Sequence, residues 1–249
     1  MLDRSVFLRP IAHRGLHDQG RGRIENTASA FKAAIAKGYG IECDLRPARD
    51  GTPFVFHDLE LKRLVEATGR ISERTPAEIG KLRLRGSEDG ILAYGDFLDL
   101  VGGRVPLLVE IKSEWDTPDV TFLKKIADIS AAHKGPLALM SFDPGLMAAV
   151  RPLAPAVPRG IVSGGYTGHD WWRHRIDLKR AFRLKHLLES GPVAPSFFSY
   201  HVKSLPTPVT RFVREVLAIP LFTWTVRSAV DRAITQRWAD AMTFEGFEP

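Results

Sequence analysis

The stretch GIECDL at residues 40–45 decides the fold. It is an apolar run in which two carboxylates, Glu42 and Asp44, stand two positions apart. Because the side chains of a strand alternate between its two faces, both carboxylates lie on one face and Cys43 points to the other. This pattern predicts a buried strand of a parallel sheet, with functional groups gathered at its end.

A second run, LLVEIK at residues 107–112, has the same design, since Glu110 and Lys112 share one face. Around these two runs, other short apolar segments alternate with longer segments of helical period, which is typical of βαβ units. The predicted strands are residues 7–12, 40–45, 107–111, 137–141, 160–163, 196–200, 221–226 and 239–244. The predicted helices are residues 27–37 with an Asn26 cap, 121–133, 145–153, 177–189, 209–217 and 230–238. Eight strands in this arrangement predict an α/β fold, a (β/α)8 TIM barrel.

The connection between the second and third predicted strands is longer than the others. Residues 52–56 are typical of an additional strand, and residues 76–82 of a short helix. We therefore expect a small insertion after strand 2, at about residues 58–92. No linker rich in Gly, Pro or Ser interrupts the sequence, and its 249 residues suit one barrel, so we expect a single domain over residues 1–249.

The composition is that of a globular enzyme-sized protein, with 44% hydrophobic and 26% charged residues. A single cysteine excludes an internal disulfide framework, and no early apolar run resembles a signal peptide, so we expect a cytoplasmic protein. The formal charge of +6 favours anionic partners. Its densest basic stretch, residues 173–186, has helical spacing without a recognition motif. We interpret it as the solvated face of a helix and expect no nucleic-acid partner.

Three carboxylates converge at the predicted strand ends: Glu42, Asp44 and Glu110. Acidic groups packed together in a barrel mouth repel one another unless a cation neutralises them. Oxygen ligands suit Mg²⁺ or Ca²⁺, so a divalent metal is the simplest interpretation. The alternative is a layer of ion pairs in which the carboxylates meet nearby cations such as Arg14, Arg46 and Lys112.

Two histidines, His13 and His57, each follow an apolar strand beside this acidic group. That is where a general acid and a general base must stand to cleave a phosphodiester, although a lone histidine is often a structural one. Arg14 and Lys112 would neutralise the phosphoryl oxygens, Arg14 through its bidentate fork and Lys112 as a point charge.

Six short motifs follow one another in the first half of the chain: HRG at 13–15, ENT at 25–27, ECD at 42–44, DG at 50–51, HD at 57–58 and EIK at 110–112. In order and spacing they resemble the glycerophosphodiester phosphodiesterase family. SF at 141–142 and WTV at 224–226 extend the resemblance thinly over most of the chain. The sequence departs from the family pattern at Ile24, at Arg46, at Arg227 and at FEGF in residues 244–247.

The resemblance implies a (β/α)8 barrel in which Glu42, Asp44 and Glu110 bind a divalent metal, with Glu25 and Asn26 close to it. It implies that His13 and His57 act as acid and base on a small-molecule glycerophosphodiester, a deacylated phospholipid head group. The products would be glycerol 3-phosphate and an alcohol. Which histidine is the acid, and whether water or a neighbouring hydroxyl is the nucleophile, stay open.

Other functions are compatible with the same residues. One is a lysophospholipase D or a phospholipase-like lyase that forms a cyclic phosphate on a similar barrel. Another is a catalytically inactive barrel that binds anionic ligands, although none of the expected catalytic residues is missing. A nucleic-acid-binding protein would differ from all of these in the salt dependence of its binding. The oligomeric state is not predicted.

An aromatic segment, YTGHDWW at residues 166–172, follows the fifth strand at the same end of the barrel. Tyr166, Trp171 and Trp172 would form a lid that holds a quaternary ammonium by cation–π contact or touches a membrane surface transiently. The alternative is ordinary loop packing. Trp224 ends a strand and is a further candidate for the pocket wall.

Overall fold

The computed structural model describes residues 1–167 and 172–249. The strands are β1 (Ile11–Ala12), β2 (Gly40–Pro47), β3 (Pro53–Val55), β4 (Leu107–Ile111), β5 (Leu137–Ser141), β6 (Arg159–Ser163), β7 (Phe197–His201), β8 (Leu221–Val226) and β9 (Ala241–Phe244). Among the described residues, eight parallel strands form a ring in the order β1-β9-β8-β7-β6-β5-β4-β2, and β1 pairs with β2 to close it. The barrel is as predicted. In this fold, functional groups meet at the carboxyl ends of the strands.

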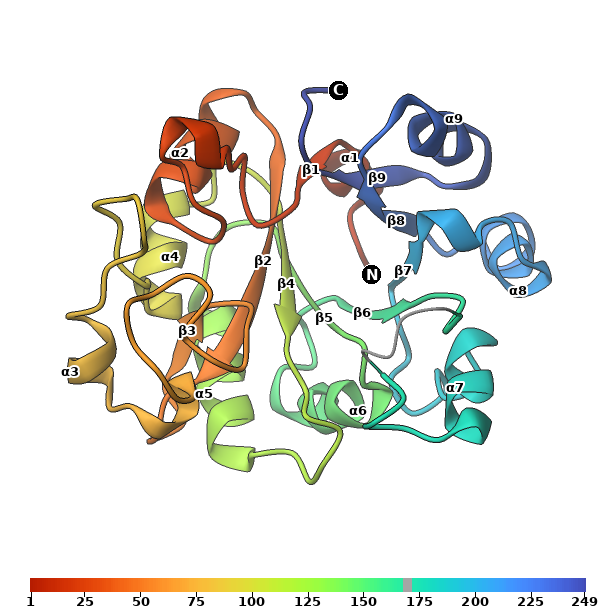
Figure 1. The fold of residues 1–249 in the computed structure, drawn as a ribbon. Coiled ribbons are helices and arrows are strands. Elements are labelled where there is room, and N and C mark those ends of the chain that lie inside the picture. Colours follow the sequence, from red (N-terminus) through yellow and green to blue (C-terminus); the bar gives the residue numbers. More distant parts are fainter. Residues whose placement is uncertain (168–171) are drawn as a thin grey trace.

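Helices cover the outside of this ring (Figure 1). They are α1 (Arg4–Phe7), α2 (Ala28–Ala36), α3 (Pro76–Ile79), α4 (Tyr94–Val101), α5 (Val120–Ala132), α6 (Pro144–Leu153), α7 (Leu178–Lys185), α8 (Pro208–Arg211) and α9 (Ala229–Trp238), with short turns η1 (Gln19–Arg21), η2 (Ile71–Glu73), η3 (Val202–Ser204) and η4 (Phe212–Val216). No described helix has both the length and the apolar character that crossing a membrane requires.

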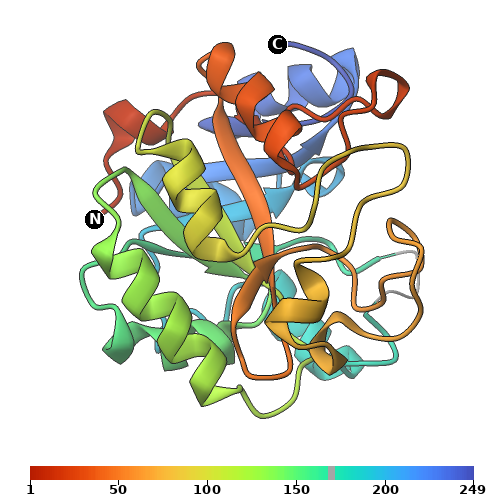
Figure 2. The same ribbon diagram turned by 90° about the vertical axis from the view of Figure 1, so that its left-hand side faces the viewer.

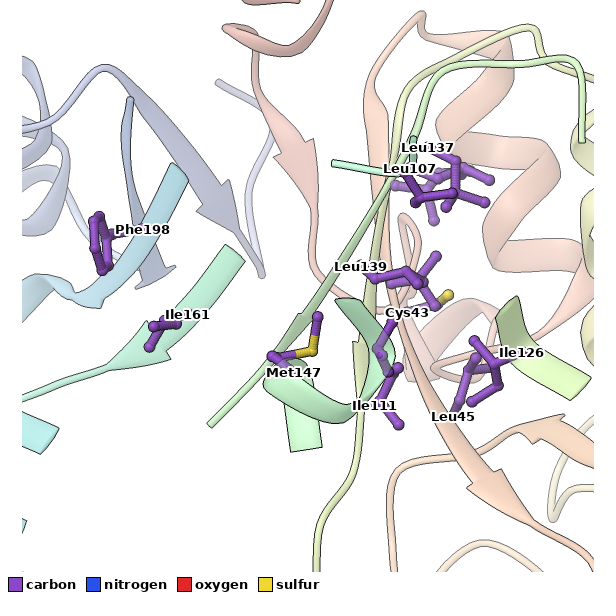
Figure 3. Close-up of a cluster of buried hydrophobic side chains, with 14 of the residues drawn as sticks. Cys43, Leu45, Leu107, Ile111, Ile126, Leu137, Leu139, Met147, Ile161 and Phe198 are labelled. Carbon is purple, nitrogen blue, oxygen red and sulfur yellow. The ribbon is translucent and has the colours of Figure 1, made fainter. Parts of the chain in front are cut away.

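The strands separate their two faces as the alternating pattern requires. Cys43 and Leu45 of β2 point outward with Ile111 of β4, toward Ile126 of α5 and Met147 of α6 (Figure 3). These outward side chains belong to the largest apolar cluster of the molecule, between the sheet and its helices. The opposite face of the same strands is therefore left for the charged residues, inside the barrel.

The prediction of a strand at residues 7–12 is wrong for most of these residues. Residues Arg4–Phe7 form helix α1, which begins where the side chain of Asp3 accepts a hydrogen bond from the backbone N–H of Ser5. Phe7 is buried with Ile11 and Phe222 in a second apolar cluster that fills the barrel interior. The apolar run therefore closes one end of the barrel, and only two residues of it pair as strand β1.

The long connection after β2 contains more structure than the sequence pattern indicated. Strand β3 pairs antiparallel with β2, and helix α3 is shorter than predicted. These elements have their own apolar cluster, which includes Phe56, Leu61 and Ile79. Helix α4 then provides the crossover to β4 and was not predicted. Figure 2 shows α4 beside α5 on the outside of the barrel.

Two further helix predictions need correction. Thr27, not Asn26, is the N-cap of α2, because the Thr27 side chain accepts from the backbone N–H of Ala30. Asn26 has a positive φ of 58° and contributes its side chain to the active site instead. The predicted helix at residues 209–217 is a short α8 that continues as the π-helical turn η4.

The buried leucines between the sheet and the helices predict a large loss of stability on truncation. Leu139→Ala in β5 removes a fully buried side chain, and we expect about 2–5 kcal/mol less free energy of unfolding in urea. Leu178→Ala is the matched control, since that side chain is 74% exposed and its loss should change stability by no more than about 0.5 kcal/mol. Equal effects of the two substitutions would contradict this assignment of the core.

Candidate active site

A cavity of about 750 Å³ lies at the carboxyl ends of the barrel strands. Most of the residues predicted as functional line it: His13, Arg14, Glu42, His57, Glu110, Lys112 and Trp224. Asp44 is almost completely buried and contacts Lys112 of this lining. Glu25 and Asn26 lie behind the wall and contact Arg14 and Asp44. The fold thus brings the whole predicted set together from segments up to about 200 residues apart.

The three carboxylates of the predicted metal site are neighbours. Glu42 and Asp44 come from β2 and Glu110 from β4, where Asp44 pairs in register with Glu110. One oxygen of each of the three lies within 4.8 Å of the others, and all three residues are buried. Burial and the adjacent charges of Asp44 and Glu110 raise the pKa of Glu42 well above its usual value.

Two buried cations hold this acidic group together. The Nζ of Lys112 lies 2.8 Å from Oδ1 of Asp44 and 2.6 Å from Oε1 of Glu110. The Nε of Arg14 lies 3.3 Å from Oδ2 of Asp44. Although burial alone acts to raise the pKa of Asp44, Lys112 and then the other nearby cations lower it well below its usual value.

The backbone conformation of the turn after β1 determines where the Arg14 side chain lies. Arg14 has a positive φ of 54°, and Gly15 follows with a φ of 80°. A Cβ at Gly15 would lie 3.0 Å from the backbone of Ala30, so this position needs glycine. The turn lets the backbone N–H of Arg14 donate to Oε2 of Glu42 at 3.0 Å while its side chain reaches Asp44. Such strain in a non-glycine residue is typical of functional sites.

Asn26 and Glu25 support the site from the next turn. The Nδ2 of Asn26 donates to Oδ2 of Asp44 at 2.8 Å, and Oε1 of Glu25 accepts from Nη1 of Arg14 at 2.8 Å. Asn26 reaches Asp44 because its left-handed backbone turns the side chain inward. The two residues therefore orient a carboxylate and a cation of the site.

His13 is held by a residue that sequence reasoning did not assign to the site. Its Nδ1 lies 2.6 Å from Oε2 of Glu245, which follows β9, and its Nε2 lies 3.8 Å from Oε2 of Glu42. Burial lowers the pKa of His13 to about 4, although Glu245 acts to raise it. The signal for Glu245 was its position directly after the last strand, which pairs with β1 so that Phe244 lies beside Ala12.

His57 is held in a similar way by the residue that follows it. Its Nδ1 lies 2.7 Å from Oδ1 of Asp58, and Arg63 in turn donates to both Asp58 and Glu25. Burial acts to raise the pKa of Asp58, but the hydrogen bond to His57 and the contact with Arg63 lower it below its usual value. Each histidine thus has one nitrogen engaged by a carboxylate and the other left for a ligand.

The opposite wall of the cavity is apolar, with two buried hydroxyls. Trp224 and Phe142 meet edge to face with ring centroids 5.1 Å apart, and the indole N–H of Trp224 donates to the backbone oxygen of Ser163. Ser199 and Thr243 are among the residues that line the cavity, but their hydroxyl oxygens are buried and have no hydrogen-bond partner among the described residues. The wall therefore suits the carbon part of a ligand.

The described aromatic residues of the segment after β6, Tyr166 and Trp172, pack against each other. Trp172 is only 2% exposed and packs with Ile176 and Leu184, while its ring meets that of Tyr166 edge to face at 5.7 Å. The Trp172 ring is thus not exposed as the predicted lid would require, and contact of the segment with a membrane surface or a quaternary ammonium stays a prediction. Trp171 lies outside the described residues.

The donor set fits a divalent cation. Three carboxylates face two cations, Arg14 and Lys112, so the group carries an excess of one negative charge. Its donors are all oxygen atoms, which suits a hard ion such as Mg²⁺ or Ca²⁺. Glu42, Asp44 and Glu110 are the residues that could hold it.

Comparison with known proteins agrees with this geometry. The model of the glycerophosphoryl diester phosphodiesterase family matches residues 13–247. The chain belongs to this family. A glycerophosphodiester phosphodiesterase 1 of Mycobacterium tuberculosis, described as probable, is 26% identical over 171 residues, which are 59% of this chain and 61% of that protein. Human glycerophosphodiester phosphodiesterase 1 is 39% identical over 131 residues, 52% of this chain and 36% of that protein. The match thus spans less than two thirds of either relative's length.

Solved structures of similar fold extend over nearly the whole chain. A phosphodiesterase of Oleispira antarctica, in complex with its product sn-glycerol-3-phosphate, has a TM-score of 0.73 and 19% identity, and covers 95% of this chain and 92% of its own. A glycerophosphodiester phosphodiesterase of Thermotoga maritima has a TM-score of 0.71 and 21% identity, with coverage of 95% and 93%. At this identity the likeness shows the fold.

A metal held by the carboxylates should stabilise the folded chain. We expect Mg²⁺ or Ca²⁺ at 100 times its dissociation constant to add about 2.7 kcal/mol to the free energy of unfolding, seen by calorimetry as a higher Tm. Glu42→Gln should remove most of that gain. Glu215→Gln, a surface glutamate bonded to Arg211, is the control and should keep it. A metal-induced rise in Tm that survives Glu42→Gln would place the ion elsewhere.

Proposed function

We propose that this chain is a metal-dependent glycerophosphodiester phosphodiesterase that releases glycerol 3-phosphate and an alcohol. One observation carries the proposal: the buried cluster of Glu42, Asp44 and Glu110 lies in the same cavity wall as two histidines, each oriented by a carboxylate. Family membership supports the reaction class. The apolar wall that Trp224 and Phe142 form supports contact with the carbon chain of a glycerol group at that end of the substrate.

The metal, held by Glu42, Asp44 and Glu110, would supply Lewis-acid stabilisation of the phosphoryl oxygens. Arg14 and Lys112 add positive charge at the same place, because both line the cavity beside these carboxylates. Since both cations are fixed by ion pairs before substrate arrives, they need little reorganisation as charge develops in the transition state.

The two histidines would divide the proton transfers. If Nδ1 of His13 donates to Glu245, its Nε2 carries a lone pair and can accept a proton from the nucleophile. Asp58, close to Nδ1 of His57, stabilises the protonated imidazole that a general acid needs. Both histidines have a carboxylate at Nδ1, but burial also lowers the pKa of His13 to about 4 and so keeps its imidazole neutral. We therefore assign His13 as the base and His57 as the acid that protonates the leaving alcohol.

The nucleophile separates hydrolysis from cyclisation. Attack by water gives glycerol 3-phosphate directly, whereas attack by the neighbouring glycerol hydroxyl gives a cyclic phosphate. Turnover in ¹⁸O-labelled water, followed by mass spectrometry, distinguishes them, since a hydrolase incorporates label into the product phosphate. A cyclic phosphate that accumulates without label would instead support the lyase function.

Removal of either histidine should abolish most of the activity. We expect His13→Ala and His57→Ala to lower kcat by about 10²- to 10⁴-fold, because each deletes one proton transfer. The measurement is a coupled assay of glycerol 3-phosphate release from a panel of glycerophosphodiesters, and of head-group alcohol release from lysophospholipids, whose other product would be lysophosphatidate. His186→Ala, at the C-cap of α7 and away from the cavity, is the matched control and should be fully active. Cleavage of lysophospholipids alone would support a lysophospholipase D.

Chelation tests the metal requirement in the same assay. We expect excess EDTA to abolish glycerol 3-phosphate release and either Mg²⁺ or Ca²⁺ to restore it, with the more effective ion identifying the preference of the site. Full activity after prolonged dialysis against EDTA would contradict metal dependence and support the alternative of a layer of ion pairs.

A further inference from the structure

Two arginines line the cavity at its outer end, beyond the catalytic groups. Arg46 is the penultimate residue of β2, and Arg175 lies in the segment before α7. Both contact the same carboxylate: Nη1 of Arg46 meets Oε1 of Glu114, and Nη2 of Arg175 lies 3.5 Å from its Oε2. Within residues 1–167 and 172–249, no second carboxylate lies within 4 Å of either guanidinium. This cluster therefore carries an excess of one positive charge.

The other cations at this end of the cavity are already matched. Arg63 contacts both Asp58 and Glu25, and Lys62 lies 2.9 Å from Glu60. Lys62 is also largely exposed, so solvent screens its charge. The unmatched positive charge is therefore that of Arg46 and Arg175.

This charge lies next to the proposed general acid. The Nε of Arg46 donates to the backbone oxygen of His57 at 3.0 Å, which fixes the guanidinium beside that residue. The side chain of Arg46 is only 8% exposed, so it loses little further solvation when a ligand binds. Because His57 protonates the leaving alcohol, the group carried by that alcohol meets Arg46 and then Arg175.

The described aromatic side chains at this end offer no open cage for a cationic head group. Trp172 is buried beneath the loop, and the guanidinium of Arg180 already lies over the ring of Trp115, 5.0 Å from its centroid. A quaternary ammonium would instead approach the two arginines and be repelled. The electrostatics favour the opposite charge on the ligand.

We infer that the enzyme prefers glycerophosphodiesters whose alcohol carries a second anionic group, a carboxylate or a phosphate, bound by Arg46 and Arg175. This inference rests on the proposed function and names its substrate class. Guanidinium groups bind such anions through paired hydrogen bonds, and Glu114 holds the two arginines in position for them.

Two matched pairs of substrates test the preference. Glycerophosphoserine differs from glycerophosphoethanolamine by one carboxylate, and glycerophosphoinositol 4-phosphate differs from glycerophosphoinositol by one phosphate. In the coupled assay we expect the anionic member of each pair to have a kcat/KM higher by about tenfold or more. The ratio should fall as salt concentration rises.

A substitution at the cluster should lower this ratio. Arg175→Gln should bring both ratios toward one, because it removes one of the two guanidinium groups that bind the anion. Arg183→Gln is the control, since this exposed arginine on α7 pairs with Glu189 outside the cavity and should leave the ratios unchanged.

The outcomes separate this inference from the proposed function. Equal kcat/KM values within both pairs, or ratios that Arg175→Gln leaves unchanged, would overturn the preference while the phosphodiesterase function stands. If none of the four diesters is cleaved with metal present, both the proposed function and the preference fail.

Discussion

The candidate active site depends on how the negative charges of three buried carboxylates are compensated. Glu42, Asp44 and Glu110 are packed within a few ångströms of one another, where their charges would be prohibitive without partners. Lys112 bridges two of them, and Arg14 reaches Asp44 from the turn after β1. The remaining negative charge is what a divalent cation would neutralise, so stability and function of this region rest on the same electrostatic balance.

The barrel makes this arrangement possible because its strands have two unlike faces. The outward residues of β2 and β4 pack against the helices in the main apolar cluster, which holds the strands rigidly. The inward residues are then free to be charged, and the parallel register sets Asp44 beside Glu110. Each histidine is fixed in turn by a carboxylate, Glu245 for His13 and Asp58 for His57. A rigid scaffold with oriented acid and base groups is the usual requirement for general acid–base catalysis.

The two ends of the cavity differ in the side chains that line them. Trp224 and Phe142 form an apolar wall near two buried hydroxyls, whereas Arg46 and Arg175 share one carboxylate at the outer end. Such a cavity suits a diester with a carbon-rich polyol on one side and a charged alcohol on the other. The specificity that we propose would come from residues outside the family motifs, in the strand end of β2 and the segment before α7.

The sequence by itself determined the barrel and the set of residues that meet in its mouth, because the alternation of side chains along a strand is a local, periodic property and the parallel strands of such a barrel end at one mouth. The sequence-based prediction was wrong where packing overrides a local pattern. The apolar run before β1 includes helix α1, which closes one end of the barrel. Asn26 is not the N-cap of α2, and its side chain donates a hydrogen bond to Asp44. Only the tertiary structure decided the partners of His13, the burial of Trp172 and the contact of both Arg46 and Arg175 with Glu114. These features depend on contacts between segments that are distant in the chain. Barrel closure and loop packing set the geometry of such contacts, and the spacing of residues in the sequence does not reveal it.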